Sequence, residues 1–188
     1  MYEIIQEDRN AMMVLNNLGS TTFDQFWIMV SSTTIWIPFY AILFYLLFKT
    51  FGWKNLIYIS IFIALGVTIS DQTAGIFKNG IERLRPCHDP SLDHLIREVK
   101  CGGGKFGFYS AHASNTFFLA SFLTFLFRGT YKYLPWVLFI WAAAVAYSRV
   151  YLGVHFPMDI LFGSAVGFLL GGLMSTLTLK TIRKTGVK

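Results

Sequence analysis

Long apolar stretches, separated by short polar segments, constrain the fold of this chain more than any other feature of its sequence. A transmembrane helix needs about 20 mostly apolar residues to cross the hydrocarbon core of a bilayer. Five stretches come near this length, although the third and fourth are short: 26–48, 56–77, 111–127, 134–147 and 157–179. Only 14% of the 188 residues are charged and 54% are hydrophobic, which favours a membrane protein over a soluble one. We expect an all-α integral membrane protein, a bundle of about five transmembrane helices that forms a single domain over residues 1–188.

The segment before these stretches has a different pattern. Residues 3–24 carry apolar side chains on roughly one side of a helix, with a break expected at Gly19–Ser20. Such an N-terminal amphipathic helix could rest on the bilayer surface or cap the end of the bundle. The first 25 residues lack a basic segment followed by an apolar core, so we expect no secretory signal and expect insertion to depend on the internal spans.

The distribution of basic residues predicts an orientation in the membrane, because cytoplasmic loops carry an excess of lysine and arginine. If the spans alternate in direction, eight basic residues fall on the side expected to face the cytoplasm: Lys49, Lys54, Arg128, Lys132, Lys180, Arg183, Lys184 and Lys188. The opposite side holds nearly as many, seven: Lys78, Arg83, Arg85, Arg97, Lys100, Lys105 and Arg149. Three of these, Lys78, Arg85 and Arg149, belong to polar clusters that mark a site, so the excess that sets the orientation is on the first side, and the opposite ends face the periplasm or exterior. The net charge of +6 includes no long basic run between aromatic residues, so we expect no nucleic-acid partner.

Three short polar clusters stand out against the apolar background. They follow the patterns K-x6-R-P, Tyr-Ser-Ala-His and S-R-x5-H-x3-D, and each lies at one end of an apolar stretch. Ionisable groups at such positions are expensive and by default mark a functional site. The residues that need an explanation are Lys78, Arg85, Ser110, His112, Arg149, His155 and Asp159. Cations can bind phosphate oxygens, one histidine can attack phosphorus while the other protonates the leaving oxygen, and an aspartate can orient the attacking group.

In these clusters the chain resembles the type 2 phosphatidic acid phosphatase superfamily of membrane lipid phosphatases, whose active site is shared with vanadium haloperoxidases. The first and third motifs of that family are matched with their spacing intact. The second, P-S-G-H in the family, is matched at Ser110 and His112 but has Tyr109 in place of proline and Ala111 in place of glycine. Three motifs in order, on helix ends that can share one membrane face, are far more specific than any one of them alone.

The resemblance implies a role for each of these residues. His155 would be the nucleophile and form a phosphohistidine, His112 would be the general acid for the leaving alcohol, and Asp159 would orient the nucleophile. The phosphate would be bound by Lys78, Arg85, Ser110, Arg149 and the backbone N–H of Ala111. No metal ion and no cofactor would be required. Alanine at position 111 keeps the N–H of the family's glycine, and we expect the change to be harmless because the backbone there should be helical.

Each cluster also has a purely structural explanation. A helix that continued past the second stretch would put Lys78 and Arg85 on one face, as a shared site requires. The structural alternative is that both side chains snorkel from a helix end. Ser110 could be a helix N-cap, which is compatible with phosphate binding because a helix N-terminus is itself an anion site. Asp159 could complement the dipole of a helix that begins near Pro157.

Three further charged residues lie close to the first cluster. Glu82 and Arg83 fall off the helix face expected for Lys78, and we interpret them as loop or surface charges. Asp71 lies seven residues before Lys78 and would share its face. It could be a partner of that lysine, or it could have a polar packing or interface role.

The longest connection, residues 86–107, contains the only two cysteines of the chain, Cys87 and Cys101. On an oxidising face of the membrane, a pair that brackets a polar loop predicts a disulfide bond. Free thiols are one alternative, and a metal site is another, since His88 and His94 lie between the cysteines. The spacing lacks the close Cys-x2-Cys pairs of structural zinc sites, which argues against a metal.

Small residues recur in the last apolar stretch. Gly163, Gly167 and Gly171 repeat every four residues, a spacing that lets helices approach closely. They could pack against a neighbouring helix of the bundle or form the face of a dimer.

The function expected from these residues is hydrolysis of a lipid phosphate or diphosphate at the outer leaflet of a bacterial inner membrane. The catalytic groups lie at span ends, where a headgroup would sit while its tails stay in the bilayer. A compact chain with little extramembrane mass favours undecaprenyl diphosphate, with phosphatidic acid, phosphatidylglycerol phosphate and lipid A 1-phosphate as alternatives. A haloperoxidase-like oxidoreductase and a catalytically inactive carrier or scaffold are the other classes, and the complete set of motif residues argues against lost activity.

Overall fold

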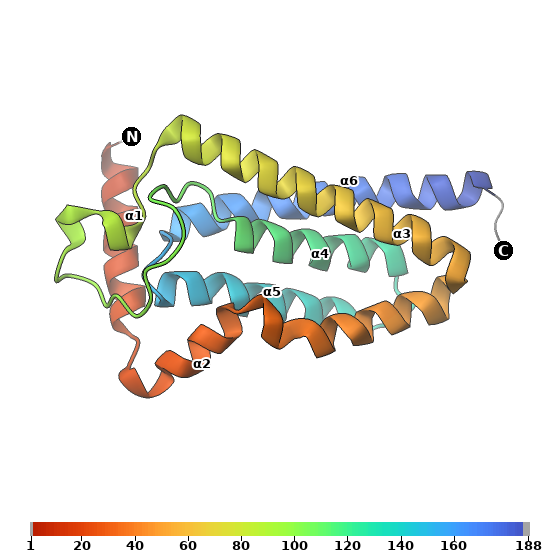
Figure 1. The fold of residues 1–188 in the computed structure, drawn as a ribbon, viewed down its shortest axis with the longest axis horizontal. Coiled ribbons are helices and arrows are strands. Elements are labelled where there is room, and N and C mark those ends of the chain that lie inside the picture. The colour runs from red at the N-terminus through yellow and green to blue at the C-terminus, as the bar shows by residue number, and fades with distance from the viewer. Residues whose placement is uncertain (1, 186–188) are drawn as a thin grey trace.

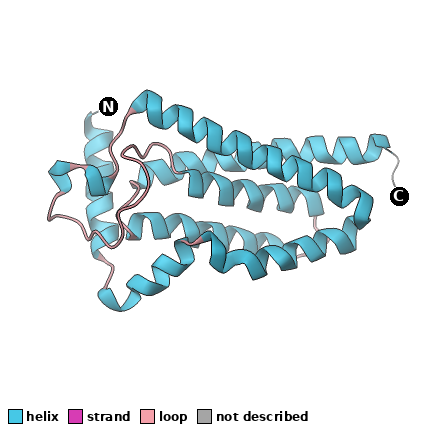
Figure 2. Cartoon of the chain, in the orientation of Figure 1, coloured by secondary structure: helices cyan, strands magenta, loops and turns pink. Residues whose placement is uncertain are grey.

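The computed structural model describes residues 2–185, and Figure 2 shows this part of the chain as helices joined by loops. Short 3-10 turns occur at Thr33–Trp36, Pro86–His88 and Pro90–Leu92. The described residues form six α-helices (Figure 1): α1 Tyr2–Asn17, α2 Thr21–Ser31, α3 Ile37–Ile81, α4 Ala111–Phe127, α5 Leu134–Tyr151 and α6 Pro157–Thr185.

α4 packs against α3, α5 and α6 at the centre of the bundle (Figure 1). Its Phe118 is fully buried. The three glycines of α6, Gly163, Gly167 and Gly171, face α4, and a methyl group added at any of them would overlap backbone atoms of α4 or of its N-cap residue. The glycine stripe therefore packs inside the bundle, the first of the two arrangements considered from the sequence.

α3 contains the second expected span and most of the first. It is 45 residues long, and its helical backbone breaks at Gly52, where φ is +74°. Glycine adopts such a φ without steric cost, which other residues cannot. The break divides α3 into two arms that run in opposite directions along the bundle (Figure 1).

The helix boundaries near the N-terminus agree with the sequence analysis in one place and differ in another. The break expected at Gly19–Ser20 separates α1 from α2. The expected start of the first span at residue 26 was wrong, because α2 continues to Ser31 and Ser32 is extended. Hydroxyl side chains compete for backbone hydrogen bonds, and the run of serines and threonines at 31–34 ends the helix. Pro38 lies in the first turn of α3, where its missing N–H costs no helical hydrogen bond.

Three helical segments of the described chain are long and apolar enough to cross a membrane: Thr33–Ile81, Leu134–Tyr151 and Pro157–Lys184. α4 is also apolar but has 17 residues. Large apolar side chains cover the outer faces of the long helices, for example Trp136 and Leu169, both 71% exposed. A surface of this kind is stable against lipid tails rather than against water.

α1 lies across one end of the bundle, beside the loop that follows α3 (Figure 1). It packs against α5 and α6, and its Met12 is fully buried beside Val150 and Phe156. Asn16, also fully buried, donates hydrogen bonds to the carbonyl groups of Val150 and Tyr151 at the C-terminus of α5, at 3.1 and 2.8 Å. The N-terminal helix thus caps the end of the bundle, which was one of the two roles expected from the sequence.

Candidate active site

The three polar clusters meet at the end of the bundle that α1 covers. A cleft of about 760 Å³ opens there. Ser110 and Asp159 are fully buried behind its wall: Asp159 lies against His155, which lines the cleft, and Ser110 donates a hydrogen bond to the Asp159 carbonyl. The predicted site residues that line the cleft are Lys78, Arg85, Ala111, His112, Arg149 and His155.

His155 and Asp159 form a pair at the start of α6. His155 lies in the connection between α5 and α6, and Asp159 is in the first turn of α6. The Asp159 Oδ2 atom accepts a hydrogen bond from the Phe156 N–H at 3.0 Å and lies 3.4 Å from Nδ1 of His155. Nδ1 has no hydrogen-bond partner within the described chain. Catalytic hydrogen bonds are often long in a free enzyme and tighten in its complex with substrate, so this separation suits an orienting carboxylate.

The surroundings of His155 keep its imidazole uncharged. Burial lowers the pKa of His155 to about 4; the Asp159 carboxylate opposes this shift, and the charges of Arg85 and Arg149 add to it. The ring is only 2% exposed. At neutral pH one ring nitrogen therefore has a free lone pair, which a nucleophile requires.

Arg83 makes contacts that the sequence analysis did not foresee. Arg83 lies in the loop after α3, as one of the two interpretations required, but it is not a surface charge. Its guanidinium donates to Asp159 Oδ1 at 2.9 Å and to Asp8 Oδ2 at 2.5 Å. The guanidinium carbon also lies 4.0 Å from the centre of the Phe156 ring. Asp8 and Arg83 are 75 positions apart, so no helical spacing in the sequence could have indicated their contact.

The N-terminus of α4 supplies the second histidine. Ser110 is the N-cap, and its Oγ accepts a hydrogen bond from the Ala113 N–H at 3.4 Å. Its own N–H donates to the Asp159 carbonyl at 3.1 Å, which ties the start of α4 to the start of α6. Ala111 is the first residue of α4 and has a helical backbone, as expected for a harmless replacement of glycine. His112 follows it and faces the cleft.

Lys78 and Arg85 reach the cleft by different routes. The prediction that one helix carries both was wrong, because α3 ends at Ile81 and Glu82 takes a left-handed conformation with φ of 51°. Arg85 lies in an extended segment, as a residue before proline should. Its guanidinium is held by two loop carbonyls, at 2.7 and 3.2 Å. Lys100 lines the same cleft, and the sequence analysis did not single it out.

Arg149, the third predicted cation, is held by a residue from the N-terminal part of the chain. Its Nη1 donates to the hydroxyl group of Ser31, the last residue of α2. Nε of Arg149 is buried and has no partner in the described chain. A buried guanidinium N–H without an acceptor is costly, and an anion in the cleft would satisfy it.

Asp71 does not pair with Lys78 in this structure. Its Oδ1 accepts a hydrogen bond from Asn115 of α4 at 2.9 Å, and no ion pair of the described residues joins it to the lysine. Ser70 and Ser114, whose hydroxyl groups are 2.7 Å apart, make a second polar contact between the same two helices. Asp71 thus helps to join α3 to α4, the helix that carries His112.

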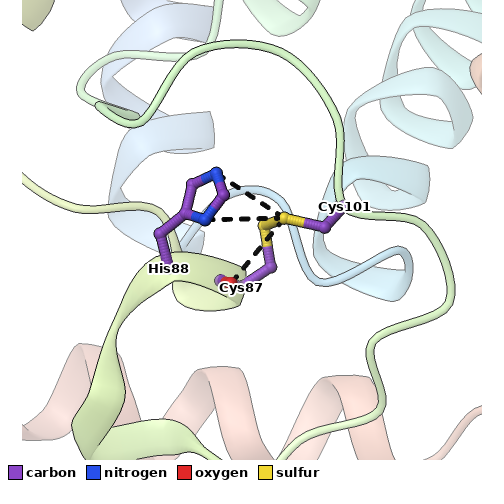
Figure 3. Close-up of side chains that lie close together, drawn as sticks. All are labelled: Cys87, His88 and Cys101. Carbon is purple, nitrogen blue, oxygen red and sulfur yellow. Dashed lines mark hydrogen bonds between the residues drawn. A yellow bond between two sulfur atoms is a disulfide. The ribbon is translucent and has the colours of Figure 1, made fainter.

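The long loop is closed by a disulfide bond between Cys87 and Cys101 (Figure 3). His88 lies beside it, with Nε2 3.7 Å from Sγ of Cys101. These three residues are close enough to suggest a metal site, but bonded sulfurs offer no thiolate ligand. His94 contacts Asp93 instead and is 92% exposed. The loop that holds Arg85 is therefore fixed by a covalent link.

An apolar cavity of about 370 Å³ adjoins the polar cleft. Ser31, Thr33 and His112 line both spaces. Beyond them the apolar cavity passes between the arms of α3, α4 and α5, past Trp36 and Leu119. The polar cleft and the apolar cavity thus lie on either side of shared residues, with cations and histidines along the first and mostly apolar side chains along the second.

Comparisons with known proteins show the family to which the chain belongs. The family model described as PAP2 superfamily matches residues 55–183. A lipid A 4'-phosphatase of Bacteroides thetaiotaomicron is 36% identical over 171 residues, which cover 89% of this chain and 75% of the relative. A lipid A 4'-phosphatase of Porphyromonas gingivalis is 36% identical over 174 residues, with 91% and 72% covered.

A solved structure shares the fold. The crystal structure of a transmembrane PAP2 type phosphatidylglycerolphosphate phosphatase from Bacillus subtilis superposes with a TM-score of 0.74, at 19% identity, over 96% of this chain and 88% of that one. Identity at that level supports the architecture alone, whereas the family match covers most of the chain. The chain belongs to the PAP2 superfamily, and it is an integral membrane lipid phosphate phosphatase.

Proposed function

We propose that the protein removes a phosphate group from lipid A at the outer leaflet of a bacterial inner membrane. The observation that carries the proposal is a cleft that brings two histidines and three predicted cations together and shares part of its lining with an apolar cavity. The names of two relatives, each matching about nine-tenths of the chain, support lipid A and its 4' position.

This substrate replaces the one favoured by the sequence analysis. Undecaprenyl diphosphate was preferred because the chain has little extramembrane mass, a property that does not distinguish one phosphate-bearing lipid from another. The lipid A phosphate considered there was the 1-phosphate, whereas the relatives' names point to the 4'-phosphate. Both phosphates are esters of a sugar that carries several acyl chains, so the same cleft chemistry applies to them.

The mechanism assigned to the site has two steps. In the first, a lone pair of His155 Nε2 attacks phosphorus, the bond from phosphorus to the lipid oxygen breaks, and His112 gives its proton to that oxygen. In the second, His112 takes a proton from water, whose oxygen attacks the phosphohistidine and releases inorganic phosphate. Asp159 orients the imidazole through Nδ1. Negative charge on the non-bridging oxygens of the transferred phosphoryl group is balanced by Lys78, Arg85 and Arg149 and by the N–H groups at the start of α4, with no metal ion required.

The proposed topology has five crossings in a single domain: the two arms of α3, then α4, α5 and α6. The lysine and arginine residues of the loops at the opposite end support a cytoplasmic location for that end. The cleft, α1 and the disulfide then lie on the outer side of the membrane, where a disulfide persists.

Turnover by purified protein tests the proposal. The detergent-solubilised chain is assayed in excess chelator with lipid A, undecaprenyl diphosphate, phosphatidic acid, phosphatidylglycerol phosphate and a soluble phosphate ester. We expect the highest kcat/KM for lipid A, with release of the 4'-phosphate identified by mass spectrometry of the product. A higher kcat/KM for another lipid would replace the substrate, a preference for the soluble ester would refute the lipid site, and activity restored only by magnesium or zinc would refute the metal-free mechanism.

A further inference from the structure

We propose that Arg83 is a positioning residue for the nucleophile and that Asp8 of the N-terminal helix holds Arg83 in place. The inference rests on the proposed function, since it requires that His155 attacks phosphorus and that Asp159 orients it. It adds to that function a chain of contacts that leads from α1, outside the family match at 55–183, to the attacking ring.

The contacts fix the Asp159 carboxylate on both of its oxygen atoms. Oδ1 accepts from Arg83 at 2.9 Å, and Oδ2 accepts from the Phe156 N–H at 3.0 Å while it faces the His155 ring. Phe156 also stacks under the guanidinium at 4.0 Å. A carboxylate held at both ends cannot rotate away from the imidazole, so Arg83 controls the orientation of a group that touches the nucleophile.

Asp8 fixes Arg83 in the same way. Asp8 is 5% exposed, and a buried carboxylate needs partners for its charge. Its Oδ2 accepts from Arg83 at 2.5 Å, and its Oδ1 accepts from the Met158 N–H, at the start of α6, at 2.8 Å. One guanidinium therefore joins two carboxylates, one of which belongs to α1 and the other to the nucleophilic pair.

These charges also act on the protonation of His155. The charged and titratable groups around the ring come from every neighbouring element: Asp159 of α6, Arg85 of the loop, Arg149 of α5, His112 of α4 and Lys78 of α3. Arg83 offsets part of the negative charge of Asp159, and Asp8 offsets part of the positive charge of Arg83. Loss of the Arg83 charge should favour the protonated ring, and loss of the Asp8 charge should disfavour it.

Kinetics of three variants test the inference, with phosphate release from the lipid substrate measured across pH. Arg83→Gln should lower kcat on the order of 10- to 100-fold, the loss expected for one charge-assisted hydrogen bond, with KM nearly unchanged. Arg83→Lys should recover part of the loss, because it keeps the charge but not the two-sided geometry. The acidic limb of kcat/KM should move to higher pH in Arg83→Gln and to lower pH in Asp8→Asn. A role limited to docking α1 would not produce opposite shifts.

Arg9→Gln is the matched control. Arg9 is the next residue of α1 and pairs with Asp89 at 2.8 Å, and the described hydrogen bonds give it no contact with Asp159. We expect wild-type kcat and an unchanged pH profile. Equal behaviour of Arg83→Gln and Arg9→Gln would overturn the inference, as would identical pH limbs in all variants. If Arg83→Gln does not fold, the other two variants decide: Arg83→Lys should lower kcat with little shift of the acidic limb, and Asp8→Asn should move that limb to lower pH. Activity that survives in His155→Ala would refute the proposed function itself, whereas an inactive His155→Ala beside a normal Arg83→Gln would refute only the positioning role.

Discussion

At the residue scale, the two histidines of the cleft differ in their neighbours. His155 is 2% exposed and faces the carboxylate of Asp159. His112 lies where the polar cleft meets the apolar cavity, since it lines both. A leaving lipid would have its oxygen near that junction while its tails extend into hydrocarbon. The arrangement therefore separates the proposed nucleophile, His155, from the proposed general acid, His112.

This separation can be tested with a leaving group that needs no proton. His155→Ala should abolish both turnover and the labelled phosphoenzyme for every substrate, because no other group replaces the nucleophile. His112→Ala should slow phosphoenzyme formation on the order of 10²- to 10⁴-fold with the lipid, the range expected of a general acid, but much less with a nitrophenyl phosphate. With that ester the phosphoenzyme should accumulate, because its hydrolysis still lacks the base. Acid-labile phosphoenzyme trapped from rapidly quenched reactions provides the measurement. Equal losses of phosphoenzyme formation in both variants with the activated ester would contradict the division of roles.

At the element scale, the contact between α4 and α6 places the two histidines relative to each other. Each helix carries one histidine at or just before its first turn, and the two N-termini are joined by the hydrogen bond from Ser110 to Asp159. Gly167 allows the close approach, because a Cβ atom there would overlap the backbone of Ser114 and Phe118. The spacing of the helices thus depends on a residue with no polar atom in its side chain.

Gly167→Ala should therefore destabilise the protein by about 1–3 kcal/mol, the usual cost of overpacking, and should also lower kcat. Gly75→Ala in α3 is the matched control. A Cβ atom at position 75 meets nothing within 4 Å, and alanine favours a helix by up to about 1 kcal/mol over glycine. Thermal unfolding in detergent should give a lower Tm for the first variant and an equal or higher Tm for the second. The opposite order would show that the glycine stripe does not set the helix spacing.

The elements that the sequence predicts well are those defined by local signals. α4 begins and ends at the expected residues, since Ser110 is an N-cap and Arg128 ends the helix in a left-handed conformation. The boundary between α2 and α3 was missed because apolar residues continue on both sides of Ser32. The contact of Arg83 with Asp8 could not be predicted from the sequence, because the two residues are 75 positions apart and meet only through the packing of α1 against the bundle.

At the scale of the whole molecule, the N-terminal segment completes a site whose motifs lie elsewhere in the chain. The family match begins at residue 55. Nevertheless Asp8 contacts Arg83, Asn16 binds the end of α5, and Ser31 holds Arg149. Removal of α1 and α2 should therefore disturb the cleft without removing any motif residue.

The orientation of the whole molecule can be tested through its disulfide. Cys87 and Cys101 should be bonded in protein taken from its native membrane, because the proposed topology places them on the oxidising side. Closure of a loop of this length contributes about 3 kcal/mol. Mass spectrometry under non-reducing conditions should find the cross-linked peptide, and replacement of both cysteines by serine should lower the Tm. Two thiols that react with an alkylating reagent before reduction would contradict the outward orientation.

The junction of the polar cleft with the apolar cavity has a consequence for the direction of the reaction. The two spaces share Ser31, Thr33 and His112. Once the ester bond is broken, the dephosphorylated lipid is free to diffuse into the bilayer, and the inorganic phosphate is free to diffuse into water. The products then occupy different phases and rarely meet again at the enzyme. Simultaneous rebinding of both products is rare, so the reverse reaction, which needs the lipid and the phosphate together, should be very slow.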